Sequence, residues 1–353
     1  MGVTMRDVAH KAGVSINTVS RVVNGYGEVS EATRQRVLAA IEELGFRPNV
    51  VARSLVSGKS QSVGLIIPQI TDPFFPEVVL GVESIARQHG YSVLLCNTNE
   101  SPQQELEYVD VLSAKQVDGI ILCGSRLDAE QLSSVAAHHR VAVLTSRRPR
   151  SAAVISIQGE QGLFEITSHL IRLGHRKIGH VGFTFGSGSE RADGYRRALR
   201  EHGLADDENL VVFSPRAHIE IAHTSALRLL QQAPEITAIT CFNDLVAIGV
   251  MRACRELGRR VPDDVAVVGF DDIDLASLVT PALTTMHIAR FHLGEMVMEL
   301  MLRVIADNGT HEELLYVEPK LVVRDSCGAR KSTWPAAQQG IGEEVMTGTN
   351  NLR

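Results

Sequence analysis

Residues 6–21 read RDVAHKAGVSINTVSR, a stretch that predicts two short helices joined by a tight turn. The first helix carries an apolar stripe of three residues, Val8, Ala9 and Ala12. Gly13 can adopt the left-handed backbone angles that end a helix. Ser15 is a favourable N-cap for the helix that follows. The stretch therefore predicts a helix-turn-helix with one buried face.

The second helix of this pair has a buried face and a polar face. Its predicted buried residues are Val19, Val22 and Val23. Its exposed residues are Ile16, Asn17, Ser20 and Arg21. Asn reads adenine and Arg reads guanine through paired hydrogen bonds to base edges, and the N-terminal turn of a recognition helix enters the major groove. Taken alone, the motif also fits an ordinary helical hairpin with a solvated face.

A third helix and a proline-led segment follow the pair. Ser30 is a candidate N-cap, and apolar residues recur at Val37, Ile41 and Leu44. Residues 47–55 then read RPNVVARSL. The proline favours a helix start, but a helix of about eight residues is unstable alone. This segment therefore predicts a helix that forms only with a partner.

With these motifs the chain resembles the headpiece of the lactose-repressor (LacI/GalR) family of bacterial transcription regulators. The matching motifs are DVA at 7–9, AGVS at 12–15, TVSR at 18–21, NG at 24–25, RPN at 47–49 and ARSL at 52–55. The resemblance continues more loosely to residue 326. It implies a homodimer that places two recognition helices in successive major grooves of a near-palindromic double-stranded DNA operator.

The resemblance also implies which residues contact DNA. They are Thr4, Ser15, Ile16, Asn17, Thr18, Ser20, Arg21, Asn24, Asn49, Ala52 and Leu55. In the family the hinge becomes helical on DNA, pairs with its dimer mate and inserts the residue that matches Leu55 into a minor-groove base step. Such a wedge costs roughly a few kcal/mol of unstacking, which is offset because the bent DNA meets more of the protein surface. The alternative for Leu55 is a core leucine on a short helix.

The charge of the 353-residue chain is unevenly distributed. The overall net charge of −6 alone argues against nucleic acid as a partner. Residues 1–60, however, hold eight Lys and Arg against five Asp and Glu, a net charge of +3, and the remainder carries −9. A basic head on an acidic body suits a protein whose head alone meets phosphates. Because +3 is modest, tight binding is expected to need two heads.

Other compositional features limit the class of protein. The five cysteines are scattered without metal-site spacing and predict buried free thiols in a reducing cytoplasm. No apolar run approaches the ~20 residues of a membrane span, and the N-terminus does not read as a signal peptide. Catalytic Ser/His/Asp sets, metal clusters and cofactor motifs are not apparent. We therefore expect a cytoplasmic, non-enzymatic protein without metal or cofactor.

After a small polar linker the chain alternates strands and helices. Strands are expected at 63–67, 91–96, 119–123, 141–144, 178–182, 210–213, 238–241 and 265–269, and helices at 77–89, 104–114, 163–173, 191–202, 221–231 and 244–257. This alternation predicts an α/β fold with parallel sheets, and the number of strands favours two doubly wound lobes. The family's body is similar to periplasmic sugar-binding proteins.

These patterns divide the chain into four segments. They are a helix-turn-helix head at 1–47, a hinge helix and linker at 48–62, a two-lobed effector-binding and dimerisation domain at 63–328, and a disordered tail at 329–353. In doubly wound folds, ligands bind at the carboxyl ends of strands. An effector is therefore expected in the cleft between the lobes.

Several residues at predicted strand ends are candidates for binding that effector. Asp72, Phe74 and Phe75 follow the first strand, where aromatic rings could pack on a sugar or base. The alternative is a turn with a buried aromatic pair. Family resemblance adds Arg147, Arg191, Asn243 and Asp271. Asp244 is expected to act as an N-cap.

The sequence leaves several functions open. Residues 158–162 and Ser146 depart from the family pattern, which puts the contacts of the second lobe in question. Residues 96–98 and 271–277 are similar to those of pentose-responsive regulators. This similarity favours a repressor whose effector is a sugar. One alternative is a regulator that binds DNA when a purine is bound to it. The others are a sugar-binding transport protein and an α/β enzyme such as a sugar kinase. The Gly-rich run 182–188 lacks the Lys-Ser/Thr of a nucleotide-binding loop.

Overall fold

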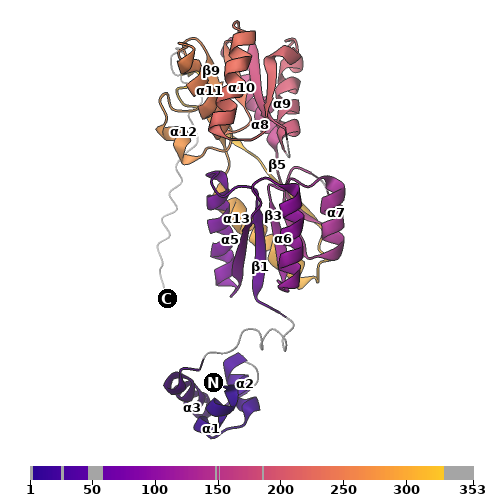
Figure 1. The fold of residues 1–353 in the computed structure, drawn as a ribbon, viewed down its shortest axis with the longest axis vertical. Coiled ribbons are helices and arrows are strands. Elements are labelled where there is room, and N and C mark those ends of the chain that lie inside the picture. Colours follow the sequence, from indigo (N-terminus) through magenta and orange to yellow (C-terminus); the bar gives the residue numbers. More distant parts are fainter. Residues whose placement is uncertain are drawn as a thin grey trace, which may run out of the picture.

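The computed structural model describes residues 3–24, 28–46, 59–147, 149–150, 152–184 and 187–329. Figure 1 shows a helical head and a body of two stacked lobes. The hinge predicted at 48–56 and nearly all of the predicted tail lie outside the described residues. The α/β body and the helical head agree with the fold class expected from the sequence.

The head consists of α1 (Met5–Ala12), α2 (Ile16–Asn24) and α3 (Glu31–Leu44). Gly13 ends α1 with φ of 65°, and the Ser15 hydroxyl accepts a hydrogen bond from the Thr18 amide at 3.1 Å. Both local predictions are confirmed. The three helices share one small core, made of Val8, Ala9, Ala12, Val19, Val22, Val37, Ala40 and Phe46.

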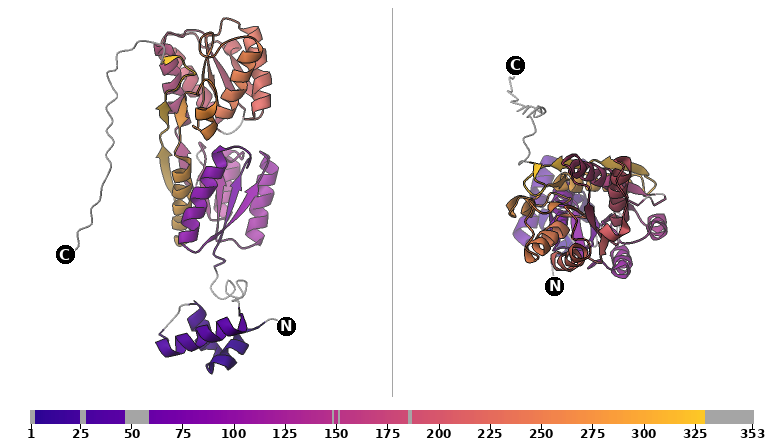
Figure 2. Two further views of the ribbon diagram at one scale, coloured as in Figure 1. Left: turned by 90° about the vertical axis from the view of Figure 1, so that its left-hand side faces the viewer. Right: turned by 90° about the horizontal axis from the view of Figure 1, so that it is seen from above.

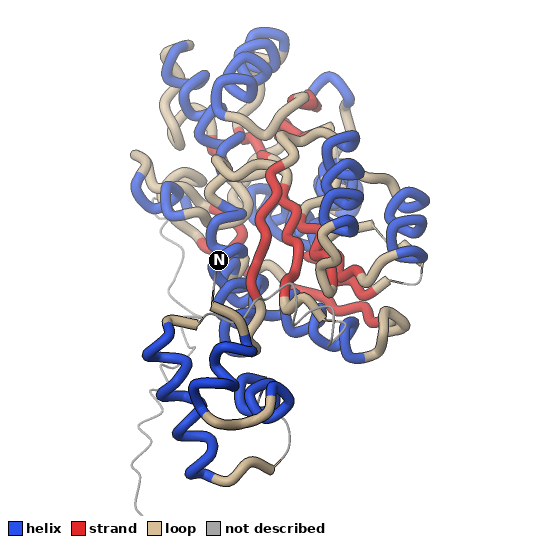
Figure 3. Tube along the Cα trace, turned by 60° about the horizontal axis from the view of Figure 1, so that its bottom comes forward, coloured by secondary structure: helices blue, strands red, loops and turns tan. Residues whose placement is uncertain are grey.

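The first lobe is a six-stranded parallel sheet in the order β11-β5-β4-β3-β1-β2. Its strands are β1 (Ser62–Ile67), β2 (Ser92–Asn97), β3 (Gly119–Cys123), β4 (Val141–Leu144), β5 (Ala153–Ile157) and β11 (Glu313–Val317). Its helices are α5 (Phe74–Gln88), α6 (Pro102–Ala114), α7 (Ala129–His138) and α13 (Arg290–Ala306). Figure 3 shows the strands running together with helices around them.

Alternation along β1 explains why helices cover both faces of this sheet. Leu65 and Ile67 belong to the core that α5 and α13 cover, whereas Ile66 belongs to the core under α6 and α7. The backbones of α5 and α13 approach closely where both carry glycine. A Cβ on Gly81 would lie 2.0 Å from the Phe291 carbonyl oxygen, so only glycine fits there.

The second lobe is a four-stranded parallel sheet in the order β7-β6-β8-β9. Its strands are β6 (Ile178–Phe183), β7 (Val211–Ser214), β8 (Ala238–Cys241) and β9 (Ala266–Val268). Its helices are α8 (Gly159–Arg172), α9 (Gly188–Glu201), α10 (Ile219–Gln232), α11 (Asp244–Glu256) and the short α12 (Asp274–Leu278), with a 3-10 turn η1 (Glu208–Leu210). Residues of α8 and α9 pack on one face, and those of α10 and α11 on the other.

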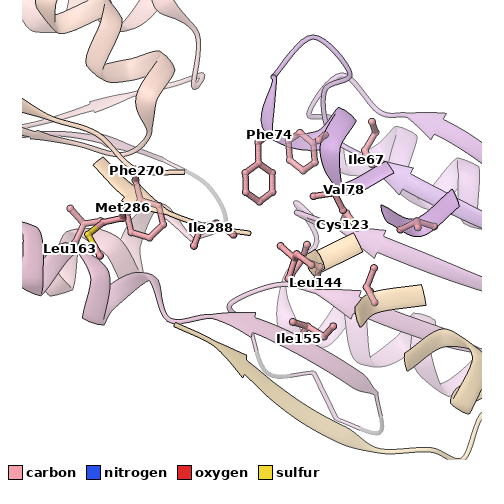
Figure 4. Packing of buried hydrophobic residues seen from close by; sticks show 14 of the residues in the cluster. Ile67, Phe74, Val78, Cys123, Leu144, Ile155, Leu163, Phe270, Met286 and Ile288 are labelled. Atoms are coloured by element: carbon pink, nitrogen blue, oxygen red, sulfur yellow. The ribbon is translucent and has the colours of Figure 1, made fainter. Parts of the chain in front are cut away.

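The chain passes between the lobes three times. It crosses from β5 to α8, from β10 (Thr285–His287) to α13, and from β11 to β12 (Lys320–Val322), which pairs antiparallel with β10. The side view in Figure 2 shows these connections along one edge of the body. One core cluster includes residues of both lobes, and Figure 4 shows Phe74 on one side of the boundary and Phe270 and Ile288 on the other.

Every strand predicted from the sequence is present, within one residue at each end. Helix α5 begins at Phe74 rather than 77, because the Asp72 carboxylate accepts a hydrogen bond from the Phe74 amide at 3.0 Å and starts the helix early. The sequence prediction missed β5, α7 and all elements after residue 269, including α13, the longest helix described.

Candidate functional site

A cavity lies where the carboxyl ends of the strands in the two lobes face each other. Its lining includes six of the seven predicted effector residues: Asp72, Phe74, Phe75, Arg191, Asn243 and Asp271. The seventh, Arg147, does not line it, although its neighbour Ser146 does. Arg147 instead lies near Glu105, whose carboxyl pKa is raised by burial, an effect that the Arg147 charge only partly opposes. The sequence could not show which of two adjacent side chains turns inward.

The first-lobe wall of the cavity is aromatic. Phe74 and Phe75 are both 8% exposed, and their rings meet edge to face with centroids 5.2 Å apart. The turn at Gly124 closes over this pair, because a Cβ there would lie 3.1 Å from the Phe75 ring. Asp72 stands beside the rings, and burial raises the pKa of its carboxyl. The wall thus combines flat apolar surface with one carboxyl group.

Arg191 is the central polar residue of the second-lobe wall. Its Nη1 donates to the Phe242 carbonyl oxygen at 2.5 Å, and its Nη2 lies 3.3 Å from Asp271 Oδ1. The guanidinium carbon lies 3.8 Å from the centroid of the Phe270 ring and 4.5 Å from that of Phe242. The Nε atom is buried and has no hydrogen-bond partner within the described residues. Arg191 is therefore held in position by these contacts, and its Nε–H is a buried donor that a ligand could satisfy.

Asp271 faces Arg191 from the loop after β9. Its backbone adopts φ of 102°, a conformation unusual for a residue with a side chain. Burial raises the pKa of Asp271 to about 7, and the Arg191 charge only partly opposes that effect. Its carboxyl group can therefore change between the donor and acceptor states near neutral pH.

The roles of Asn243 and Asp244 differ from the sequence prediction. Asn243, not Asp244, caps α11, because its Oδ1 accepts from the Val246 amide at 3.0 Å. Asp244 is fully buried and accepts from the Ile273 amide and the Thr285 hydroxyl. The cap uses the side-chain oxygen of Asn243, and the residue also lines the cavity.

Sequence reasoning missed several cavity residues. They are Gly124, Ser125, Arg126, Leu144, Thr145, Ser146, Ile157, Gly159, Ser187, Ala217 and Phe242. Ser125 and Arg126 follow β3 and Thr145 follows β4, so the rule that ligands bind at carboxyl ends of strands could have found them. Ser187 and Ala217 lie in loops whose path the sequence does not define.

The described DNA-contact candidates lie at the start of α1, in the turn before α2, and on α2. Ile16 is 43% exposed, and Asn17 and Arg21 are exposed with it. Thr18 and Ser20 are half-buried. The Thr4 amide and hydroxyl both donate to the Asp7 carboxylate, which starts α1. The Asn24 side chain, and Asn49, Ala52 and Leu55, lie outside what the structure describes.

Comparison with known proteins identifies the chain. Residues 4–49 match the model for bacterial regulatory proteins of the lacI family, and residues 60–324 match that for periplasmic binding proteins and the sugar binding domain of the LacI family. The chain belongs to the LacI family. Members of this family regulate transcription by binding DNA, and the chain is a DNA-binding regulator rather than an enzyme.

Three relatives show how far this LacI-family chain matches known members. It is 35% identical over 328 residues to the HTH-type transcriptional repressor PurR of Photobacterium profundum, covering 92% of this chain and 98% of the relative. It is 36% identical over 325 residues to the ribose operon repressor of Halalkalibacterium halodurans, covering 92% and 96%. The lac repressor dimer bound to operator and the anti-inducer ONPF matches with a TM-score of 0.83 and 28% identity, covering 93% and 99%.

The remaining properties of this family member concern partners and cofactors. Its partners are operator DNA and a small-molecule effector. All five cysteines are free; four are buried, as predicted, and Cys96 is only half-buried. In the described ranges, no helix has the length and hydropathy needed to cross a bilayer. The same ranges hold no group of three His, Cys, Asp or Glu side chains that could bind a metal.

Proposed function

We propose that the protein is a cytoplasmic repressor whose effector is a sugar bound between the lobes. The main support for a sugar effector is the composition of the cavity. Aromatic rings from the first lobe face Arg191, Asn243 and Asp271 of the second lobe. Aromatic faces pack on the C–H surfaces of sugars, and alternating donors and acceptors suit hydroxyl groups. Arg191 Nε and the Asn243 amide supply donors, and Asp72 and Asp271 supply acceptors.

The proposal assigns one task to each segment of the chain. Residues 1–47 read the operator, residues 48–62 form the hinge, and residues 63–328 bind effector and dimerise. Effector binding changes the angle between the lobes, which changes the spacing of the paired hinges and the fit of Leu55 in the minor groove. Couplings of this kind are typically ~1–3 kcal/mol. The implied DNA contacts, including Asn24, Asn49 and Ala52, belong to the same proposal.

Exposed leucines support a homodimer. Leu80 on α5 is 51% exposed, and Leu94 and Leu95 on the edge strand β2 are 36% and 44% exposed. Leu278, at the end of α12, is 74% exposed. Leu94 and Leu95 point to opposite faces of the sheet, so the exposed edge of β2 is flanked by apolar side chains and could pair with another chain. A second copy of the chain on this surface would bring two heads to one near-palindromic site.

The test uses the full chain and an operator selected from random DNA by the protein itself. Fluorescence anisotropy would measure operator affinity with and without D-ribose, other uncharged monosaccharides, sugar phosphates, hypoxanthine and guanine. We expect a sugar to change operator affinity about 5- to 150-fold. A response to purines alone would replace the sugar with the ligand class that the PurR relative suggests. No response to any compound would contradict the sugar proposal.

A further inference from the structure

The cavity holds a second arginine whose charge is already neutralised. Arg126 follows β3 and lines the cavity beside the aromatic wall. Its Nη2 lies 3.1 Å from Glu100 Oε1, and both side chains are nearly buried, at 11% and 15% exposed. A guanidinium without a carboxylate partner is well suited to bind the carboxylate or phosphate of an anionic ligand. Here that role is taken by a carboxylate of the protein.

The backbone holds Glu100 in the position that this pairing requires. Asn99 and Glu100 both adopt left-handed conformations, with φ of 49° and 65°. The Glu100 amide donates to the Pro68 carbonyl oxygen at 2.9 Å. Left-handed conformations of residues other than glycine are unfavourable and tend to occur at functional sites. The loop thus directs a carboxylate at Arg126 despite a local conformational cost.

Residues of the second lobe also contact the ion pair between Arg126 and Glu100. The guanidinium carbon of Arg126 lies 4.7 Å from the centroid of the Phe183 ring, which belongs to β6. Arg216, also from the second lobe, lies 3.9 Å from the other oxygen of Glu100. The Arg126 amide donates to Glu105 at 2.9 Å. Arg126 is therefore held by both lobes and cannot turn toward a ligand without losing these interactions.

The charges around the cavity favour the same conclusion. Among the described lining residues, the cations are Arg126 and Arg191, and each has a carboxylate partner. Asp72 adds a further carboxyl group, which accepts a hydrogen bond from the Phe74 amide. Burial raises the pKa of Asp72, and the nearby Glu100 raises it further. A ligand with its own negative charge would meet carboxyl groups instead of a free cation.

We propose that Glu100 restricts the effector to uncharged molecules by holding Arg126 in an ion pair. The effector class is then an uncharged, hydroxyl-rich sugar, and phosphorylated or carboxylated sugars are rejected. Glu100 acts as a positioning residue, because it reaches the ligand only through Arg126. This inference rests on the proposed sugar effector for its ligand class, but the role of Glu100 can be tested separately.

The first test compares matched ligands on the full chain. Isothermal titration calorimetry would measure D-ribose against D-ribose 5-phosphate, D-glucose against D-glucose 6-phosphate, and D-galactose against D-galacturonate. For whichever sugar pair binds, we expect the wild type to bind the uncharged member at least 100-fold more tightly than the charged member. Glu100→Gln should reduce that preference at least tenfold, whereas Glu107→Gln, which removes an exposed charge from the same lobe, should not change it. A wild type that prefers the charged member would overturn the proposal.

The second test does not depend on a sugar. Sodium sulfate, compared with sodium chloride at equal ionic strength, should raise the thermal unfolding midpoint of Glu100→Gln more than that of the wild type. The double variant with Arg126→Met should lose this gain. Equal gains in all three proteins would show that Glu100 does not control the charge of Arg126. If no sugar binds but the sulfate result holds, the sugar assignment fails and the role of Glu100 stands.

If Glu100→Gln does not fold, Arg126→Met alone decides the question. Because Arg126 does not bind ligand charge in the proposed arrangement, this variant should still prefer uncharged sugars. A phosphorylated sugar that binds the wild type but not Arg126→Met would contradict the proposal.

Discussion

The DNA-reading face of the head and the effector cleft of the body use polar side chains in opposite ways. Arg21 and Asn17 stand exposed on a small three-helix core, whereas Arg191, Asn243 and Asp271 are each at most 5% exposed. Exposed side chains make contacts that can be removed one at a time. Buried polar side chains depend on one another, because each satisfies its neighbour. Substitutions in the cleft should therefore affect stability as well as binding, and substitutions on the head should affect binding alone.

The largest expected effect is that of Arg191→Ala. Above the Asp271 pKa of about 7, where that carboxyl is ionised, the substitution leaves a buried charge without its partner. Removing one member of a buried ion pair destabilises a protein by about 3–5 kcal/mol. Urea denaturation would measure this loss, and calorimetry should show that effector binding is abolished. Arg200→Ala, on the exposed side of the same helix, is the control. Unchanged effector affinity in both Arg191→Ala and Asp271→Ala would remove both residues from the binding site.

The second effect is the contribution of Asp271 to the pH dependence of stability. Burial raises the pKa of Asp271 from 3.8 to about 7 in the folded chain. The folded state then holds a proton that the unfolded state releases between these values, so stability should fall as pH rises from 4 to 7. Each unit corresponds to about 1.4 kcal/mol, so the loss should reach roughly a few kcal/mol. Denaturation of Asp271→Asn should lack this part of the slope, and an identical slope would contradict the assignment.

The smallest effect is expected on the head. Arg21→Ala should weaken the selected operator by ~1–3 kcal/mol and relax preference at one base pair, without changing the thermal midpoint of the body. Anisotropy on the operator and on single-base variants would measure both. Arg36→Ala, an exposed substitution on α3, serves as the control. An equal loss of affinity on every sequence would make Arg21 a phosphate contact.

The same contrast explains how much could be predicted from the sequence. In the head, Gly13 and Ser15 determine the turn locally, and these local features were sufficient. In the body, short continuous apolar runs predicted strands such as β3 and β8 with the observed bounds. Helix α13 was missed although its buried residues Leu293, Val297 and Leu300 recur at helical spacing, so the apolar stripe was present in the sequence and was overlooked.

Only the cleft residues that follow a predicted strand could be identified from the sequence. Asp271 and Asn243 follow strands directly, and both line the cavity. Loop conformations, such as the left-handed backbone of Glu100, decide the remaining features of the cleft. They determine whether Ser146 or Arg147 turns inward and that Arg126 contacts Glu100. Those conformations are determined by interactions between residues far apart in the chain, and a single sequence does not reveal them.

The route of the chain through the first lobe determines the order in which the protein can fold during synthesis. The head is complete once α3 has emerged, but β5 acquires its outer partner β11, and α5 its cover α13, only after residues 290–317 have been made. Domains generally fold as they emerge from the ribosome, yet this lobe must wait for most of the body. During that interval the apolar face of α5 and one edge of β5 are open to other chains, which makes the unfinished body the stage most exposed to aggregation.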